Sequence, residues 1–384
     1  MKITHTLIIG MALMTSACTE QQFSVPVFSY DKRLLEIKDG QNMPLLDTTE
    51  YKMELYATLK MPDRYKGIEV SKFEYIDGRF YILDEEYNKT VFVFDSIGNF
   101  VASLGEQGRA SNEYLYKPND FFVDRKNKLV NVHEQNARRI HRFSLDGKQT
   151  NLINTEIWPY SIGFLSNGHY AAAFDHPSAG NGLQLGVFDD DGNCVQPLIN
   201  QKESSEFVNN RHAFINKDDK LYHIPNFSDS IIVISGDTIS EVIKLKFKSP
   251  FINSDVIDDA KNGDLYEYQN FDGVTVLSDY YETDKYISFS YSKRNLVIGC
   301  IIDKETGKQY HFTSTPFDGL MPMAHYTIND NIMYLLLTEY DVKEFQMLLG
   351  NDDISSELKK TSSVMRKILA EEPKNYVLKV IINQ

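Results

Sequence analysis

The chain has 384 residues, of which 42% are apolar and 12% aromatic, and this composition is enough to bury a large core. Its 54 acidic residues outnumber its 40 basic ones, and the net charge of −14 argues against nucleic acid as a partner, because phosphate neutralisation requires Lys and Arg. The 23 Tyr and 23 Phe favour strands over helices.

The start of the chain, residues 1–17, predicts a signal peptide. A basic residue precedes a short apolar run at residues 7–13, which lacks the roughly 20 apolar residues that a membrane span requires. Small residues then lead to Cys18, and this ending resembles that of bacterial lipoprotein signals. The resemblance implies cleavage before Cys18, a lipid on that cysteine and an outer-membrane anchor in a Gram-negative cell envelope, on the periplasmic or the surface side. We expect a lipidated linker over residues 18–49 and one folded domain over residues 50–384.

A unit of strand, tight turn, strand, polar loop, strand, Gly turn and strand recurs along the folded domain. In the first copy the turns are Asp77-Gly78 and Ile97-Gly98, and Asp-Gly between alternating runs is a strong hairpin signal. The units recur every ~40–55 residues, a period that indicates four-stranded β-propeller blades. The near-complete units are Phe73–Leu104, Asp120–Ile153, Ile162–Ile199, Phe214–Phe247 and Val274–Phe312.

The sixth unit is interrupted. It starts at His325–Leu337 and resumes with Tyr376–Ile382 after a short helical insert, expected at about residues 352–372. Its fourth strand is missing, and Met53–Leu59 is an unassigned strand at the other end of the chain. We therefore predict an all-β, six-bladed β-propeller of four-stranded antiparallel blades, in which the N-terminal strand closes the last blade and removes the open sheet edges.

The connection between the first two units carries a family signature. Its sequence resembles a loop of bacterial six-bladed β-propeller lipoproteins, which are TolB-like in architecture and contain NHL-type repeats. The matching residues are Gly105, Gly108, Arg109, Glu113 and Tyr114, whereas Ala110-Ser111-Asn112 replaces the family's Gly-Pro-Gly. The resemblance implies a lipid-anchored propeller and supplies no catalytic residue. The loop residues are expected to have a structural or a binding role.

No local motif for catalysis is recognisable. His133-Glu134 starts like a zinc-protease motif, but Ala137 stands where the second histidine belongs. The run Asp189–Asn193 is similar to part of a calcium loop and is better explained as a hairpin turn. The sequence thus predicts no catalytic residue, no cofactor and no metal ligand. Single residues from several blades could still hold a Ca²⁺ ion in the central channel without a local signature.

The expected function is binding. Trp158, the only Trp, lies near Tyr160 and His176-Pro177, and this group fits either a ligand mouth or a packing cluster at a blade edge. Propellers present loops around a central axis, and we expect a binding module or scaffold for an envelope protein, a small molecule or a glycan. The alternative is a hydrolase or lyase that acts on a carbohydrate or lactone with a channel metal. Acidic residues converging on the axis would favour the enzyme, and an aromatic face would favour binding.

Overall fold

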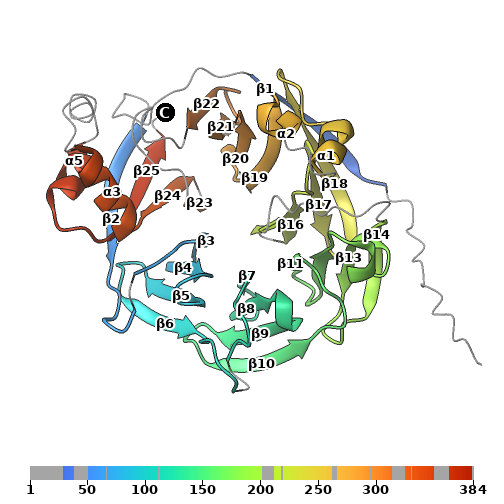
Figure 1. The fold of residues 1–384 in the computed structure, drawn as a ribbon, viewed down its shortest axis with the longest axis horizontal. Coiled ribbons are helices and arrows are strands. Elements are labelled where there is room, and N and C mark those ends of the chain that lie inside the picture. The colour runs from blue at the N-terminus through green and yellow to red at the C-terminus, as the bar shows by residue number, and fades with distance from the viewer. Residues whose placement is uncertain are drawn as a thin grey trace, which may run out of the picture.

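The computed structural model describes residues 29–38, 51–65, 67–110, 113–200, 212–217, 219–261, 266–294, 296–313, 325–329, 331–349 and 363–382. Their strands form six sheets that stand as blades around one axis, as Figure 1 shows. Five of these sheets have four strands and one has five. The all-β, six-bladed propeller expected from the sequence is therefore confirmed.

In the first five blades the strands follow one another along the chain, with the innermost strand first. Blade 1 contains β3 (Lys72–Ile76), β4 (Arg79–Asp84), β5 (Thr90–Asp95) and β6 (Phe100–Leu104). Blade 2 contains β7 (Asp120–Asp124), β8 (Leu129–Glu134), β9 (Arg139–Ser144) and β10 (Gln149–Asn154). Blade 3 contains β11 (Ser161–Phe164), β12 (Tyr170–Ala173), β13 (Leu183–Phe188) and β14 (Cys194–Asn200). Blade 4 contains β15 (Phe214–Lys217), β16 (Lys220–His223), β17 (Ser230–Ser235) and β18 (Thr238–Phe247), and blade 5 contains β19 (Val274–Glu282), β20 (Tyr286–Lys293), β21 (Leu296–Asp303) and β22 (Gln309–Thr313).

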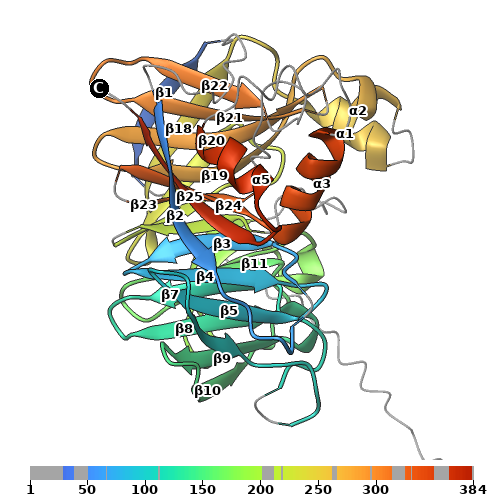
Figure 2. The same cartoon turned by 90° about the vertical axis from the view of Figure 1, so that its left-hand side faces the viewer.

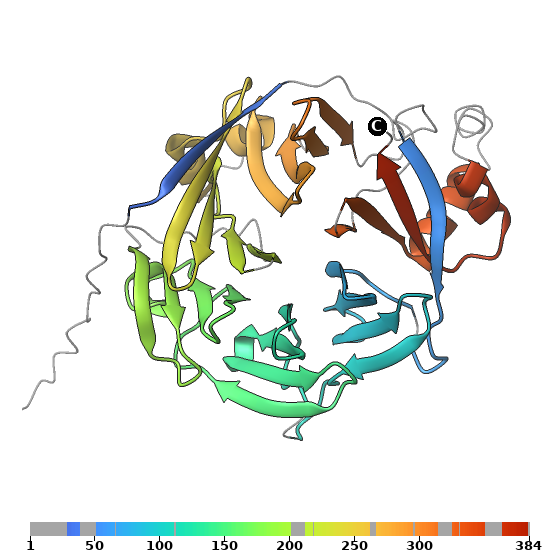
Figure 3. The ribbon, with the colours of Figure 1, turned by 180° about the vertical axis from the view of Figure 1, so that it is seen from behind.

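Every blade has the same two ends, because its strands are antiparallel. The tight turns, such as Asp77-Gly78 and Ile97-Gly98 in blade 1, lie at one end, which we call the turn face. The loops between second and third strands, and the connections to the next blade, lie at the other end, which we call the loop face. The inner strands surround the axis between the two faces, as the view from behind shows (Figure 3).

Blade 6 is completed by the two ends of the folded domain. Its strands are β23 (Tyr326–Asn329), β24 (Ile332–Leu337), β25 (Asn375–Ile382) and the N-terminal β2 (Tyr51–Leu59). Strand β2 pairs antiparallel with β25 along its length, from Tyr51 opposite Ile382 to Leu59 opposite Asn375. The closure of the last blade by the N-terminal strand is thus confirmed.

Blade 6 is interrupted by a helical insert, whose described helices are α3 (Glu339–Leu349) and α5 (Ser363–Ala370). Their apolar faces pack on the blade through Val342, Phe345, Met365 and Ile368. The sequence predicts this insert at about residues 352–372; helix actually begins earlier, at Glu339, because two apolar residues three apart already face the blade. Residues 350–362 lie outside the described residues.

Further helices lie in the connections. Helices α1 (Ser254–Lys261) and α2 (Tyr266–Asn270) lie between blades 4 and 5, and Figure 2 shows them on the same side of the ring as α3. Two short 3₁₀ helices, η1 (Gln135–Ala137) and η2 (Pro177–Ala179), follow β8 and β12. None of the helices in the described part of the chain is long and apolar enough to cross a membrane.

Strand β1 (Asp31–Ile37) adds a fifth, parallel strand to the outside of blade 4. The Arg33 guanidinium binds both carboxylate oxygens of Glu282 in blade 5, at 2.8 and 2.7 Å, and lies 2.9 Å from Glu241 in blade 4. The sequence predicts a linker over residues 18–49, and for residues 31–37 this prediction is wrong. The segment is a strand because it finds a sheet edge and two carboxylates far away in the sequence, so β1 fastens blade 4 to blade 5.

The ring closure can be tested by one buried position of β2. Ala57 is buried between blade 6 and blade 1, whereas Leu55, on the other side of the same strand, is exposed. We expect Ala57→Asp to lower the free energy of unfolding by about 3 kcal/mol or more, because it leaves an unpaired charge in the core. Urea denaturation measures the change.

The matched control is Leu55→Asp, which places the same charge on the exposed side of β2 and should cost much less. Deleting residues 50–60 should leave the edge of β25 open and cause aggregation or unfolding. A truncated protein that melts like the parent would show that β2 does not close the ring.

Candidate functional site

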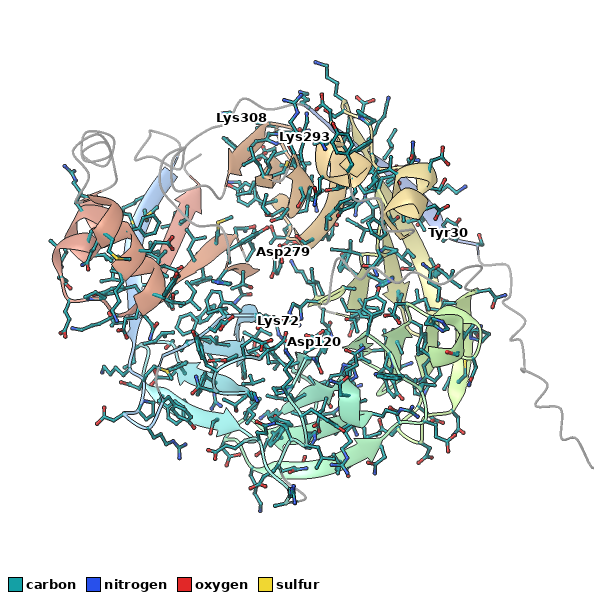
Figure 4. All side chains as sticks on the ribbon, viewed as in Figure 1. Tyr30, Lys72, Asp120, Asp279, Lys293 and Lys308 are labelled. Carbon is teal, nitrogen blue, oxygen red and sulfur yellow. The ribbon has the colours of Figure 1, made fainter. Side chains whose placement is uncertain are left out.

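Ionisable side chains from different blades meet at the propeller axis, as Figure 4 shows for Lys72, Asp120 and Asp279. Lys72 and Asp120 are the first residues of the inner strands β3 and β7, and Asp279 lies in the inner strand β19. The Lys72 Nζ atom is 2.9 Å from Asp120 Oδ1 and 3.1 Å from Glu74 Oε1, and it donates to the Phe121 carbonyl at 2.8 Å. We call Lys72, Glu74, Asp120 and Asp279 the axial cluster. Its central ion pair is almost completely shielded from water.

Mutual attraction keeps Lys72 and Asp120 charged in spite of their burial. Burial acts to lower the pKa of Lys72, but the carboxylates of Asp120 and Glu74 outweigh it, and the pKa lies above its usual value. Burial acts to raise the pKa of Asp120, but Lys72 and His212 outweigh it, and this pKa lies below its usual value. Each group therefore stabilises the charged form of the other.

Asp279 differs from its neighbours because burial raises its pKa and favours its neutral form. The Ser278 hydroxyl donates to its Oδ2 at 2.8 Å. Its φ of +53° lies in the left-handed region, at a bulge where the register of β19 against β20 shifts between Ser278 and Tyr281. A bulge re-aims a side chain, and such backbone strain in a non-glycine residue is characteristic of functional sites.

The axial cluster bears directly on the choice between enzyme and binding module. Carboxylates from blades 1, 2 and 5 converge on the axis, as a channel metal would require. However, the Lys72 ammonium already occupies the position beside Asp120 and would repel a metal cation there. Across the described ranges, no group of three or more His, Cys, Asp or Glu side chains is placed to hold a metal ion.

The family-signature loop folds around a buried tyrosine. Tyr114 is fully buried, and its hydroxyl donates to the Leu104 carbonyl. Gly105 has a φ of +73°, and a Cβ there would lie 2.8 Å from the tyrosine ring. A Cβ at Gly108 would collide with the Glu113 carboxylate, which accepts the Ala110 backbone N–H at 2.8 Å.

These contacts give the signature loop a structural role, in which it joins the outer strand of blade 1 to the inner strand of blade 2. Arg109 is exposed on the surface of the loop. Cys18, the expected lipidation site, and Ser111-Asn112 lie outside the described residues.

A pocket of about 520 Å³ opens on the loop face between blades 2 and 3. Trp158 and His176 line it, and the indole is 44% exposed. Tyr160 is instead buried in the core between the blades. Of the two interpretations that the sequence left open, the ligand mouth fits Trp158 and His176, and the packing cluster fits Tyr160.

Sequence reasoning did not find the axial cluster. Lys72, Asp120 and Asp279 belong to three blades and share no local spacing that would bring them together. Lys72 and Asp120 could have been found by aligning the repeat units. The alignment places Lys72, Asp120 and Ser161 at the same position, the start of an inner strand. Asp279 reaches the axis through a bulge, which has no signature in this sequence.

Comparisons with known proteins agree with the fold and assign no activity. A family model described as "Domain of unknown function (DUF4934)" matches residues 68–379, and no curated protein matches the chain. The structure of a predicted exported protein from Bacteroides fragilis is similar, with a TM-score of 0.73 at 16% identity over 91% of this chain and 100% of that chain. A member of the DUF4221 family from Bacteroides vulgatus matches with a TM-score of 0.48 at 10% identity over 87% and 99% of the two chains. An inactive virginiamycin B lyase from Staphylococcus aureus, solved with quinupristin, matches with a TM-score of 0.41 at 16% identity over 74% and 81%.

The role of Lys72 can be tested by removing its charge. We expect Lys72→Met to lower the free energy of unfolding by about 3 kcal/mol at neutral pH, because the buried Asp120 loses its ammonium partner and keeps only His212 beside it. Acid should shrink this deficit, since a buried carboxyl without its partner has a raised pKa and becomes neutral as the pH falls. Urea denaturation at pH 7 and pH 5 checks both effects, with the exposed Lys148→Met as control. Equal stability of Lys72→Met and the parent at pH 7 would contradict the proposed ion pair.

Buried neutral histidines should make the fold sensitive to acid. Burial lowers the pKa of His133 to about 4 and that of His223 to about 3. A histidine in the unfolded chain has a pKa of about 6.5, so below that pH the unfolded chain binds protons that the folded chain does not. Stability is therefore complete above about pH 6.5 and should fall by about 3 kcal/mol for each histidine by pH 4.

Urea denaturation as a function of pH measures this loss. His223→Asn keeps a similar shape but does not titrate. It should abolish the part of the acid-induced loss of stability that His223 causes, so the free energy of unfolding should depend less on pH. A parent profile that is already flat between pH 7 and pH 4 would contradict the account.

Proposed function

The chain belongs to the DUF4934 family, and we propose that it is a lipid-anchored binding module of the Gram-negative cell envelope, whose partner docks on the loop face. The observation that carries this proposal is a set of large apolar side chains exposed on that face over blades 1 to 3. We call this set the aromatic band; it consists of Tyr87, Leu115, Tyr116 and Trp158.

Printed contacts connect the loops that carry the aromatic band. Next to Tyr87 and Leu115, the Lys117 ammonium pairs with Glu86 and lies 3.3 Å from Glu85. The Tyr116 backbone N–H donates to Glu134 at 2.7 Å, which ties this loop to the end of β8. The Gln135 N–H donates to Asn119 at 3.0 Å, and the Arg138 guanidinium lies 5.4 Å from the centre of the Trp158 ring. These contacts link the loops that carry the aromatic band to one another.

Exposed aromatic side chains on one face indicate an interaction surface. A single exposed apolar residue is ordinary, but a connected group on loops around a propeller axis is typical of a partner-binding face. Tyr87 is 75% exposed although it is flanked by ordered strands. Tyr and Trp also bury much area at low entropic cost when a partner covers them. An aromatic face favours a binding module, and the ammonium at the axis disfavours a channel-metal hydrolase or lyase.

Two features support export and anchoring. The sequence before Cys18 resembles a lipoprotein signal, and the similar structure from Bacteroides fragilis is that of a predicted exported protein. The loop around Gly105 and Tyr114 resembles that of NHL-type, TolB-like propeller lipoproteins, whose members are anchored in this way. The partner is an envelope protein, a small molecule or a glycan, and the lipid on Cys18 holds the propeller at the outer membrane.

The lipid anchor is tested by Cys18→Ala. We expect this variant to move from the membrane fraction to the soluble fraction of the envelope, because the lipid is the anchor in this proposal. Immunoblots of fractionated cells measure the distribution, and Cys194→Ala is the control that keeps Cys18. Unchanged membrane retention of Cys18→Ala would rule out lipidation as the anchor.

Binding without turnover is tested by combining thermal denaturation with product analysis. A ligand that binds only the folded state stabilises it by RT ln(1 + [L]/Kd), so the melting temperature rises with the ligand concentration. We expect a compound that raises it to be recovered unchanged, and Tyr116→Ser with Trp158→Ser to weaken the shift. Conversion of glycoside or lactone substrates that stops on chelation, together with one bound metal ion per chain, would overturn the proposed function in favour of the enzyme.

A further inference from the structure

Resting on the proposed binding function, we propose that the pocket beside Trp158 is a saccharide-binding site, in which the indole stacks on a sugar ring and planar polar side chains bind its hydroxyl groups. The pocket lies on the loop face between blades 2 and 3, at the edge of the aromatic band. Its volume, about 520 Å³, is in the range of small-molecule sites and leaves room for a short oligosaccharide. Among the described residues, Arg138, Glu156, Trp158, Asp175 and His176 line the pocket.

The main chain that carries the Trp158 indole is held in place before any ligand arrives. The Trp158 backbone N–H donates to the Ala179 carbonyl at 3.0 Å, which fixes this segment to the far wall of the pocket. Ile157 and Tyr160, on either side in the sequence, are buried in the core between blades 2 and 3. Trp158 itself is nevertheless 44% exposed. A half-exposed indole on a pocket wall offers a flat apolar surface, which matches the C–H face of a sugar ring.

Arg138 supplies hydrogen-bond donors beside the indole. Its φ of +54° is in the left-handed region, and the Thr155 N–H donates to its carbonyl at 2.8 Å, which holds the strained backbone. The guanidinium lies 5.4 Å from the Trp158 ring centre. In the described part of the chain, no carboxylate forms an ion pair with it, so its donors remain available to a ligand. Strain that aims a side chain into a pocket is characteristic of ligand clamps.

The opposite wall adds a fixed donor and two acidic acceptors. The Ser178 backbone N–H donates to His176 Nδ1 at 3.2 Å, so Nδ1 acts as an acceptor and Nε2 is the ring nitrogen left to donate to a ligand. The carboxylates of Glu156 and Asp175 line the same pocket. Donors and acceptors therefore surround one apolar ring, which is the pattern that vicinal hydroxyl groups require.

This mixture of groups distinguishes a saccharide from other ligands. A phosphate or nucleotide would need several cations, and among the described lining residues Arg138 is the one Lys or Arg. A fatty chain would leave the Arg138 guanidinium desolvated with nothing to bind it. A neutral polyhydroxylated ring satisfies the donors, the acceptors and the indole together.

The single Trp makes the site directly observable. Selective excitation of indole fluorescence reports on Trp158 alone, because the chain has only one Trp. Purified protein is titrated with trisaccharides of glucose, xylose, N-acetylglucosamine and galacturonic acid, and with a tripeptide and inorganic phosphate as non-saccharide probes. We expect at least one trisaccharide to change the emission saturably and the other two probes to leave it unchanged.

Variants then locate the site by calorimetry, which does not depend on the fluorophore. We expect Trp158→Ala and Arg138→Ala each to weaken the binding of that trisaccharide at least about tenfold, which corresponds to about 1.4 kcal/mol. Tyr340→Ala removes an exposed aromatic ring from α3, on the outside of blade 6, and should leave affinity unchanged. Circular dichroism confirms that each variant is folded.

The outcomes separate this inference from the proposed function. If no trisaccharide binds, or if binding is unchanged in Trp158→Ala, the saccharide site is refuted. If in that case a non-saccharide ligand still stabilises the fold and loses its effect in Tyr116→Ser, the binding function stands without the saccharide. If a trisaccharide binds and is then hydrolysed, the saccharide site is supported, but the proposal that the protein binds without turnover is wrong.

Discussion

The structure depends on the pairing of β2 with β25, which joins the two ends of the folded domain. Without β2, the outer edge of β25 in blade 6 would be unpaired, and backbone N–H and C=O groups at such an edge favour aggregation. The pairing of Tyr51 through Leu59 with Ile382 through Asn375 satisfies these groups. It also draws blade 6 against blade 1, where Tyr334 packs beside Tyr75 with ring centres 4.4 Å apart.

Ring closure creates the chemistry at the axis. The inner strands of blades 1 and 2 are close enough for Lys72 to contact Asp120, Glu74 reaches Lys72 from the same strand β3, and Asp279 faces them from the opposite side (Figure 4). The carboxylates of Glu74 and Asp120 would repel each other at low dielectric if no cation lay beside both of them. The lysine supplies that cation from the chain itself. The ion pair at the axis therefore stabilises the fold, whereas the exposed aromatic side chains and the Trp158 pocket lie on the loop face.

Much of the fold can be predicted from the sequence, because the residues of the tight turns mark where each strand ends. Turns such as Asp77-Gly78 and Asp146-Gly147 delimit the strands of each blade, and the missing strand of blade 6 points to Met53–Leu59. Strand β1 could not be predicted in this way, since Arg33 finds its partner Glu282 across 249 positions of sequence.

The candidate sites, like the fold, can be predicted from the sequence only in part. Trp158 stands out as the single Trp of the chain, but only the structure shows that it lines a pocket whereas Tyr160 is buried. Asp279 depends on a bulge, and its place at the axis follows from tertiary structure alone. Turn residues act locally and can be read from sequence; side chains from separate blades meet only when the ring closes.

The central claim is that the loop face holds the partner while the axis and the turn face serve the fold. Hydrogen–deuterium exchange of the protein with and without a bound ligand tests this claim most directly. The account predicts that added protection is confined to loop-face segments beside the pocket, at residues 135–138, 155–158 and 175–179. Protection centred on the turn face, at residues 77–78 and 96–98, with the loop face unchanged, would contradict it.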